Sequence, residues 1–361
     1  MPKKVICVAG ARPNFMKLAP LLKVLSADSD FQPLLTHTGQ HYSDQMSGQF
    51  FRDLGLPAPD HYLEVGSGSH GAQTGEIMRR FEEVVLAERP DAVVVVGDVN
   101  STLAGALVAA KLRIPVAHLE SGLRSFDRSM PEEINRLATD AVCDLLLVTE
   151  ESGADNLRRE GVACERIRVV GNLMIDTLLQ NRERARESRL PAEIGARDGE
   201  FGLVTLHRPS NVDDPAKLQE LIEALGVISA TIPVYFPAHP RTRGRLGALP
   251  PGIVLLEPLG YIDFVALMSR SRVVLTDSGG IQEETTGLAI PCLTLRENTE
   301  RPITITQGTN RLAGVTKKSI LAAWQEFLDN PKTGRVPPLW DGHAAERSRD
   351  ALRELLGLPP L

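Results

Sequence analysis

Short apolar runs alternate along the whole chain with longer segments in which apolar residues recur every three or four positions. The runs are rich in Val, Ile and Leu, and most of them end in glycine or a polar residue. They lie at residues 5–10, 33–39, 61–65, 92–97, 114–121, 145–150 and 167–172 in the first half, and at 202–207, 233–239, 252–258, 272–278 and 291–295 in the second. Such strands, alternating with helices, predict the α/β class with parallel sheets wound by helices.

The length of the chain predicts two domains. Its 361 residues exceed the size, roughly 250–300 residues, at which a single core stops growing. Between the two sets of strands, residues 180–200 are charged and poor in large apolar side chains, so the boundary is placed near 172–199. We expect α/β domains at 1–172 and 173–340, followed by an amphipathic helix within 341–361.

Polar side chains gather where these predicted strands end. Open α/β sheets bind ligands beyond the carboxyl ends of their strands, and two such sheets facing each other would form one cleft. The residues at these ends are Arg12, Asp98, Glu120, His207, His239 and Ser278.

The stretch LTDSGGIQEE joins a strand to a helix through Ser278, Gly279 and Gly280. A helix N-terminus exposes unpaired N–H groups, and glycines let a phosphate approach them closely. Glu284, about one turn further on, would then face a group attached to that phosphate, such as a ribose diol. The same residues also fit a serine N-cap followed by a tight turn.

The first domain offers a second set of charged groups. Arg12 and Lys17 flank a strand-to-helix turn, where two cations suit an anionic substrate or form a solvated surface pair. Asp98 follows four valines, so it is either a carboxylate with a perturbed pKa or a helix N-cap. The segment HLESGLRSFDRSMPEEINR adds Glu120, with His118 on the same face of its strand, and Glu132.

Composition narrows the class of protein. A net charge of −6 and 4% aromatic residues argue against nucleic-acid binding. No apolar run is long enough to cross a membrane, and the N-terminus has no signal-peptide pattern. The scattered Cys7, Cys143, Cys164 and Cys292 are typical of free thiols in a reducing cytoplasm. No metal-ligand spacing and no dinucleotide fingerprint is present, so we expect neither a metal nor a cofactor.

Taken in order, the motifs resemble those of the non-hydrolysing UDP-N-acetylglucosamine 2-epimerases. The matching stretches, between Val5 and Leu312, are GARPNFMKLAP, GDVNSTLA, HLESGLRSFDRSMPEEINR, VTLHRPSN, PAHPRT, TDSGGIQEE and TERP. The resemblance implies two Rossmann-like domains of the glycosyltransferase-B type, facing each other across a cleft. It also implies a C-terminal helix that crosses back to the first domain, and a homodimer.

The resemblance further implies residue roles. The catalytic residues would be Asp98, Glu120, Glu132 and His207. The substrate-binding residues would be Arg12, Lys17, His239, Phe264 beside the uracil, Ser278, Gly279 and Gly280 on the diphosphate, Glu284 on the ribose, and Arg301.

The sequence also departs from the pattern of many bacterial members of that family. Asn14 stands where a glutamate is usual, HRPSN replaces HRREN, and Ile303 follows TERP in place of a glutamate. Bacterial members often bind a second, regulatory UDP-GlcNAc. Gln40, Gln73, Glu132, Arg208 and His239 match parts of that site, but Ala72 replaces an expected arginine.

The expected activity is the cytoplasmic interconversion of UDP-GlcNAc and UDP-ManNAc for polysaccharide synthesis, through elimination of UDP and a 2-acetamidoglucal. Three alternatives remain at this point: a hydrolysing epimerase, a retaining glycosyltransferase of the same fold, and a catalytically silent UDP-sugar-binding regulator.

Overall fold

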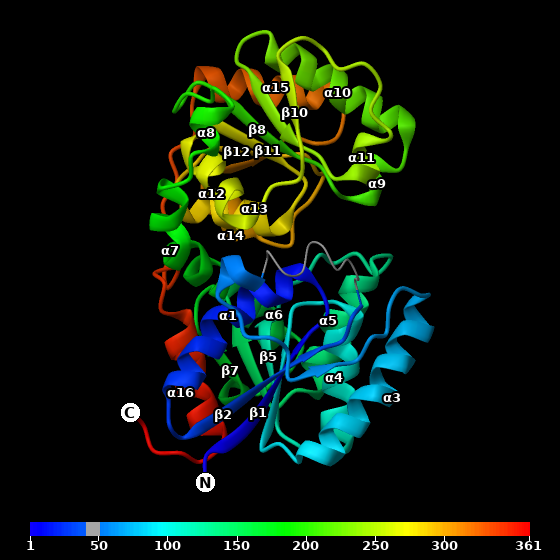
Figure 1. The fold of residues 1–361 in the computed structure, drawn as a ribbon, viewed down its shortest axis with the longest axis vertical. Coiled ribbons are helices and arrows are strands. Elements are labelled where there is room, and N and C mark those ends of the chain that lie inside the picture. The colour runs from blue at the N-terminus through cyan, green and yellow to red at the C-terminus, as the bar shows by residue number, and fades with distance from the viewer. Residues whose placement is uncertain (41–50) are drawn as a thin grey trace. The chain divides into compact units, whose positions relative to one another are not determined.

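The computed structural model describes residues 1–40 and 51–361, and the chain divides into two compact units (Figure 1). The first unit comprises Met1–Leu179 together with Pro338–Leu361, and the second comprises Gln180–Pro337. Each unit is built around its own parallel sheet. The α/β fold expected from the alternating pattern is therefore confirmed.

The first unit contains a seven-stranded sheet in the order β3-β2-β1-β4-β5-β6-β7. Its strands are β1 (Lys3–Ala9), β2 (Phe31–His37), β3 (His61–Tyr62), β4 (Ala92–Val96), β5 (Val116–Ser121), β6 (Leu145–Val148) and β7 (Ile167–Val169). The helices described here are α1 (Arg12–Ala27), α3 (His70–Glu88), α4 (Asn100–Lys111), α5 (Pro131–Val142), α6 (Glu151–Arg159), a 3₁₀ turn η1 (Cys164–Arg166), and α16 (Ala344–Leu355). Figure 1 shows α1 and α16 on one side of this sheet and α3 and α4 on the other.

The second unit contains a six-stranded sheet in the order β10-β9-β8-β11-β12-β13. Its strands are β8 (Gly202–Thr205), β9 (Val234–Pro237), β10 (Ile253–Leu256), β11 (Val273–Thr276), β12 (Cys292–Thr294) and β13 (Asn310–Leu312). Its helices are α8 (Leu190–Glu193), α9 (Pro209–Val212), α10 (Pro215–Ser229), α11 (Pro240–Arg243), α12 (Tyr261–Arg270), α13 (Gly279–Gly287), α14 (Pro302–Thr306) and α15 (Lys317–Asp329). The helix α7 (Leu173–Arg186) spans the boundary between the units.

The central strands are buried on both faces, which explains their unbroken apolar sequences. All five residues of β4 are buried, and so are all four of β11. Because no side chain of such a strand reaches water, a polar residue within it needs a buried partner, whereas a residue after its end does not. This is the local reason why Asp98 and Asp277 each follow a run of Val and Leu closely.

Each sheet has one point at which the strand order reverses. In the first unit this point lies between β1 and β4, and in the second between β8 and β11. Helices leave neighbouring strands in opposite directions there, which opens a crevice at the carboxyl ends of the strands. The residues just beyond these four strands therefore take the positions where α/β proteins bind ligands.

The C-terminal residues belong to the first unit. The amphipathic helix expected at 344–357 is α16, which packs against α1. Arg353 donates to Asp28 at 2.7 Å and to Asp30 at 2.8 Å, at the end of α1. At the other end of α16, the backbone N–H groups of Ala344 and Ala345 donate to the buried carboxylate of Asp176.

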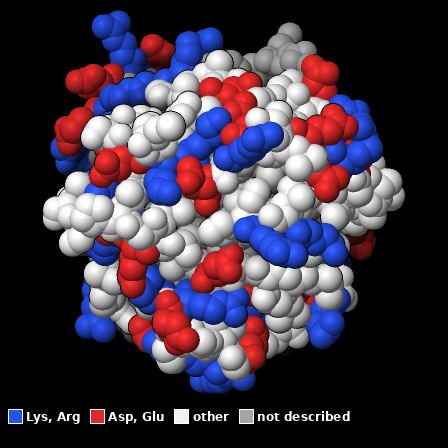
Figure 2. All heavy atoms as spheres, turned by 90° about the horizontal axis from the view of Figure 1, so that it is seen from below, with Lys and Arg blue, Asp and Glu red and all other residues white. Residues whose placement is uncertain are grey.

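The surface carries both signs of charge. Figure 2 shows Lys and Arg intermixed with Asp and Glu over one face, without a continuous basic area. Within residues 1–40 and 51–361, no helix combines the length and the apolar character that crossing a bilayer requires.

Candidate functional site

A buried amide joins the two strand ends at the reversal point of the first sheet. Asn14 Oδ1 accepts hydrogen bonds from the backbone N–H groups of Gly10 at 3.1 Å and Ala11 at 2.9 Å. Its Nδ2 donates to the carbonyl oxygen of Val96, the last residue of β4, at 3.1 Å. Asn14, which stands where a glutamate is usual, therefore links the β1–α1 turn to the end of β4 through hydrogen bonds.

One turn further along α1, Lys17 forms an ion pair with Glu120 at the end of β5. Both side chains are buried, so Lys17 is not the solvated surface cation that was one interpretation of the sequence. Arg12, by contrast, is exposed at the first position of α1. Burying this ammonium and this carboxylate together costs the desolvation of both groups, which their mutual attraction offsets.

The backbone of Glu120 adopts an unusual conformation. Its φ is 65°, in the left-handed region that residues with a Cβ rarely adopt. The pairing of β5 with β6 shifts register between Leu119 and Ser121, which marks a bulge. Such strain is concentrated at functional sites. Here it turns the carboxylate toward Gly97, where an added Cβ would lie 3.3 Å from Glu120 Oε2.

A second carboxylate lies just beyond Gly97. Asp98 Oδ2 accepts a hydrogen bond from Arg136 at 2.5 Å, and the same guanidinium contacts Glu133 at 2.7 Å. Burial favours the neutral form of Glu133, but hydrogen bonds from the Ser125 backbone and from Arg136 outweigh it and lower the pKa of that carboxyl. One cation thus faces two carboxylates, and Asp98 is the more exposed of the two.

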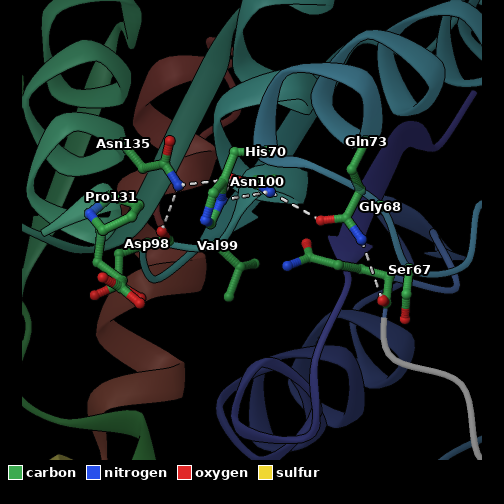
Figure 3. A pocket seen from close by; sticks show the side chains of 11 residues that line it. Ser67, Gly68, His70, Gln73, Asp98, Val99, Asn100, Pro131 and Asn135 are labelled. Carbon is green, nitrogen blue, oxygen red and sulfur yellow. Dashed lines mark hydrogen bonds between the residues drawn. The ribbon is translucent and has the colours of Figure 1, made fainter. Parts of the chain in front are cut away.

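A cavity of about 350 Å³ opens beside Asp98 (Figure 3). Its lining includes the first residues of three helices, His70 of α3, Asn100 of α4 and Pro131 of α5. Helix N-termini favour negative or strongly polar ligand groups. Of the predicted catalytic carboxylates, Asp98 and Glu132 line this cavity.

Amide side chains form the rest of its polar lining. Asn100 donates to Gln73 at 2.8 Å, and Gln73 donates to the carbonyl oxygen of Gly66 at 2.8 Å. Gln40 accepts from both the backbone and the hydroxyl of Ser101. Gln40 and Gln73, predicted as regulatory-site residues, are therefore hydrogen-bonded within the first unit, whereas Ala72 is exposed.

In the second unit, His207 and Asp277 lie at the reversal point between β8 and β11. His207 Nδ1 is 2.8 Å from Asp277 Oδ1, and the backbone N–H groups of His207 and Arg208 also donate to this carboxylate. Asp277 is fully buried while the His207 side chain is 60% exposed. Burial would raise the pKa of Asp277, but its hydrogen bonds, with that from His207 the largest, lower it. The imidazole is thus held by an ionised carboxylate and presents its other edge to solvent.

Arginines gather next to this pair. Arg296 contacts Glu300 at 2.7 Å, Arg208 contacts it at 3.5 Å, and Arg301 contacts it at 3.6 Å. Arg301 Nε also lies 2.9 Å from Glu283. These cations hold the pKa of Glu300 far below its usual range despite burial. Three guanidinium groups thus lie among the carboxylates of Asp277, Glu283 and Glu300, and guanidinium groups are suited to binding phosphate oxygens.

The loop at residues 278–280 agrees with both interpretations of its sequence. Ser278 caps α13, since its hydroxyl accepts from the N–H of Ile281 at 3.5 Å. Gly279 is also required for a close approach, because a Cβ there would lie 2.5 Å from Arg301 Nη1. Both Gly279 and Gly280 belong to the first turn of α13, so the arginine lies over a helix N-terminus.

The remaining predicted residues of the second unit fall on three helices. Glu284 is buried on α13, and its Oε1 accepts from the hydroxyl of Tyr261 at 2.8 Å. Phe264 is half-buried on α12, one turn after Tyr261. His239 is exposed directly before α11.

Sequence reasoning did not assign a role to Asp277 or Arg136. Asp277 follows the buried strand β11 in the same way that Asp98 closely follows β4, so the rule that singled out Asp98 would have found it. Arg136 lies four positions after Glu132 on α5, but nothing in the sequence indicates that its guanidinium reaches Asp98.

Comparison with known proteins places this geometry among enzymes. The family model described as UDP-N-acetylglucosamine 2-epimerase matches residues 23–353. The UDP-N-acetylglucosamine 2-epimerase of Methanocaldococcus jannaschii is 42% identical over 360 residues, covering 95% of this chain and 97% of that protein. The UDP-2,3-diacetamido-2,3-dideoxy-D-glucuronate 2-epimerase of Pseudomonas aeruginosa is 43% identical over 358 residues, covering 98% of this chain and 100% of that protein.

Solved structures give the same result. The crystal structure of the M. jannaschii enzyme in complex with UDP-GlcNAc and UDP has a TM-score of 0.89 and 41% identity, covering 97% of this chain and 99% of that one. The Neisseria meningitidis UDP-GlcNAc 2-epimerase bound to UDP-GlcNAc has a TM-score of 0.88 and 29% identity, covering 97% of this chain and 100% of that one.

Proposed function

The chain belongs to the UDP-N-acetylglucosamine 2-epimerase family, and we propose that it interconverts UDP-GlcNAc and UDP-ManNAc by eliminating and re-adding UDP. The observation that carries the proposal is the pair of carboxylates on either side of Gly97, Glu120 in contact with Lys17 and Asp98 in contact with Arg136. Epimerisation at C2 needs one group to remove a proton and another to return it on the opposite face. Asp98, Glu120 and Glu132 supply these groups from the first unit.

The proposed reaction conserves atoms and electrons without a redox partner. A carboxylate takes the C2 proton as the C1–O bond breaks, and the electron pair of that bond leaves with UDP. A C1–C2 double bond forms, which gives a 2-acetamidoglucal. A protonated carboxyl then delivers a proton to the other face of C2, and the UDP oxygen attacks C1 again. The net change is inversion at C2.

The cations near these carboxylates support different roles for them. Glu120 contacts Lys17, and a neighbouring cation favours the carboxylate form that proton removal requires. Arg136 is shared between Asp98 and Glu133, so a proton on Asp98 leaves Glu133 fully paired. Asp98 is therefore our choice for the proton-returning acid, with Glu132 at the same cavity as the third member of the set.

In the second unit, the proposed role of the arginines and of the α13 N-terminus is to hold the diphosphate. Negative charge grows on UDP as it departs, and fixed donors stabilise such charge best when they are already oriented. His207 is oriented by Asp277 and would donate to the departing UDP. Glu284 would accept the ribose hydroxyls, and Phe264 would lie beside the uracil.

The decisive experiment follows the reaction in D2O by proton NMR, starting from UDP-GlcNAc and enzyme alone. We expect UDP-ManNAc to appear with deuterium at C2, and deuterium also to enter recovered UDP-GlcNAc. Free ManNAc and UDP as the only products would indicate a hydrolysing epimerase. An unchanged substrate would overturn the proposal.

The similarity to the P. aeruginosa enzyme supports a second candidate substrate, UDP-2,3-diacetamido-2,3-dideoxy-D-glucuronate. The same inversion at C2 would then take place on a sugar that carries a carboxylate. The cavity beside Asp98 favours the neutral sugar. Its lining, among the described residues, includes the carboxylates of Asp98 and Glu132. Like charges within one cavity oppose each other. Initial rates with both nucleotide sugars decide the question, and a higher kcat/KM for the diacetamido-uronate would reassign the substrate.

We also propose that the enzyme is a cytoplasmic homodimer. The dimer follows from the resemblance to the family, and sedimentation equilibrium tests it. The cytoplasmic location is supported by the cysteines, all four of which are free. Burial raises the pKa of the Cys7 and Cys292 thiols to about 12, so these two are inert toward disulfide exchange.

A further inference from the structure

His118 is completely buried in β5 and has no role in the proposed reaction. Its Nδ1 lies 2.6 Å from Asp140 Oδ1, and its Nε2 lies 2.8 Å from the carbonyl oxygen of Gly97. The ring therefore joins the end of β4 to α5 through the middle of the sheet. Both of its hydrogen-bonding edges are occupied.

The partners determine which atoms carry protons. A backbone carbonyl can only accept, so Nε2 must donate to Gly97. Asp140 also accepts from the N–H of Gly122 at 3.1 Å and from Arg124 at 2.7 Å. Burial would raise the pKa of Asp140, but its hydrogen bond and charge interaction with His118, together with Arg124, lower it. Nδ1 faces this carboxylate at hydrogen-bond distance, so both edges of the ring are tethered.

The carboxylate that holds His118 is itself fixed by a second side chain. Arg124 contacts Asp140 at 2.7 Å and Glu160 at 2.6 Å. The position of Asp140, and with it the tether on His118 Nδ1, is therefore determined by more than one contact.

The two tethers hold the backbone on both sides of the proposed reaction site. Gly97, with a φ of 70°, immediately precedes Asp98. Glu120, with its φ of 65°, lies two residues after His118 and two before Gly122, which Asp140 holds. Glycine adopts a positive φ readily, but the conformation of Glu120 is costly unless its surroundings enforce it.

We propose that His118 is a positioning residue that fixes the separation of Asp98 and Glu120 by bonding to Gly97 O and Asp140 at once. The expected effect of His118 on kcat rests on the proposed function, whereas its expected hydrogen bonds to Gly97 O and Asp140 do not. The competing explanation is a core histidine that contributes only to stability.

Kinetics separate the two explanations. In His118→Phe the ring shape stays and both tethers are lost. Because displacements of about 1 Å at a reacting group cost on the order of 100-fold in rate, we expect kcat to fall about 100-fold. KM for UDP-GlcNAc and the Kd of UDP should stay within about threefold of wild type, since the proposed UDP residues lie in the second unit. In His118→Gln an amide N–H can still reach Gly97 O, and kcat should recover most of the loss.

A measurement on the wild-type protein needs neither folding of the variants nor substrate. Nitrogen-15 NMR of the His118 ring should show Nε2 protonated, because the Gly97 carbonyl oxygen can only accept. In Asp140→Asn the Nε2 proton should stay, because Gly97 O still requires a donor. An unprotonated Nε2 in the wild type would overturn the proposal, as would a folded His118→Phe with wild-type kcat. If the wild type does not epimerise UDP-GlcNAc, the proposed function fails while the NMR result still decides the role of His118.

Discussion

The buried carboxylate of Asp277 holds the exposed imidazole of His207 at the strand-order reversal of the second sheet, with 2.8 Å between Oδ1 and Nδ1. The carboxylate fixes both the orientation and the tautomer of the ring. The Asp277→Asn variant keeps the size of the side chain but removes its charge and replaces one acceptor oxygen with an NH2 group, which only donates. We expect kcat to fall by roughly 10²–10⁴-fold, the usual contribution of an oriented acid–base group, while the Kd of UDP changes little.

The double variant Asp277→Asn/His207→Asn should be little worse than His207→Asn alone, because residues that act as a unit are not additive. Asp214→Asn is the matched control, since Asp214 caps α10 in the same unit and asparagine is an equally good cap. Additive losses from the two site variants would show that Asp277 does not act through His207.

A second prediction concerns the approach of Arg301 to Gly279. The Cβ of Gly279→Ala would lie 2.5 Å from Arg301 Nη1, so the guanidinium must move away from the α13 N-terminus. Since a charged hydrogen bond is worth about 1.5–3 kcal/mol, we expect the Kd of UDP to rise about tenfold or more. Calorimetry measures it. Gly247→Ala is the control, because no atom lies within 4 Å of a Cβ there, and equal affinities of the two variants would contradict the prediction.

The sequence was sufficient to predict the fold because the strands are short, buried and apolar, and because glycine or a polar residue ends most of them. The strand β13 (Asn310–Leu312) was not predicted. It has three residues, one of them Arg311, and Asn310 is tied to the α13 backbone by a side-chain hydrogen bond, so neither its composition nor its length distinguishes it from a loop.

The candidate site was predictable only in part. The rule that ligands bind at strand ends predicted Asp98, Glu120 and His207. It could do so because the end of a strand is visible in the local sequence. The partners of these residues depend on contacts across the fold, as with Lys17 and Glu120, which are 103 residues apart in sequence. The left-handed backbone of Glu120 has no sequence signal, because only its surroundings enforce it.

A third prediction concerns pH. Burial of His37, whose ring lies 4.8 Å from those of Phe15 and Tyr62, lowers its pKa from 6.5 to about 4. A histidine with a lowered pKa stabilises the fold above pH 6.5, and this contribution is lost as the pH falls through about 4. The span from 6.5 to about 4 corresponds to at most roughly 3 kcal/mol.

NMR titration of the His37 ring measures this directly, and it should remain neutral at pH 5.5. In urea unfolding, the free energy of unfolding should decrease less between pH 7 and pH 4 for His37→Gln than for the wild type. His343→Gln, at an exposed position, should leave the pH dependence unchanged. A His37 ring that is half-protonated near pH 6.5 would disprove the assignment.

The last prediction concerns regulation by a second UDP-GlcNAc. An arginine at position 72 would bind a phosphate through a charged fork, and its replacement by Ala72 removes on the order of 1.5–3 kcal/mol, or about ten- to a hundredfold in affinity. Gln40 and Gln73 are hydrogen-bonded within the first unit, and Arg208 is engaged with Glu300 and with the carbonyl oxygen of Asp277. Pro209 at the start of α9 has no backbone N–H to offer.

We therefore expect UDP-ManNAc to be converted without added UDP-GlcNAc. Progress curves start from UDP-ManNAc freed of UDP-GlcNAc, and an immediate linear rate is the expected result. The Ala72→Arg variant restores the fork and should introduce a dependence on UDP-GlcNAc, whereas Gly75→Ala on the same helix, where a Cβ meets nothing within 4 Å, should not. A lag in the wild type that trace UDP-GlcNAc abolishes would refute the prediction, and it would mean that another side chain, such as His70 at the cavity, has taken over the missing contact.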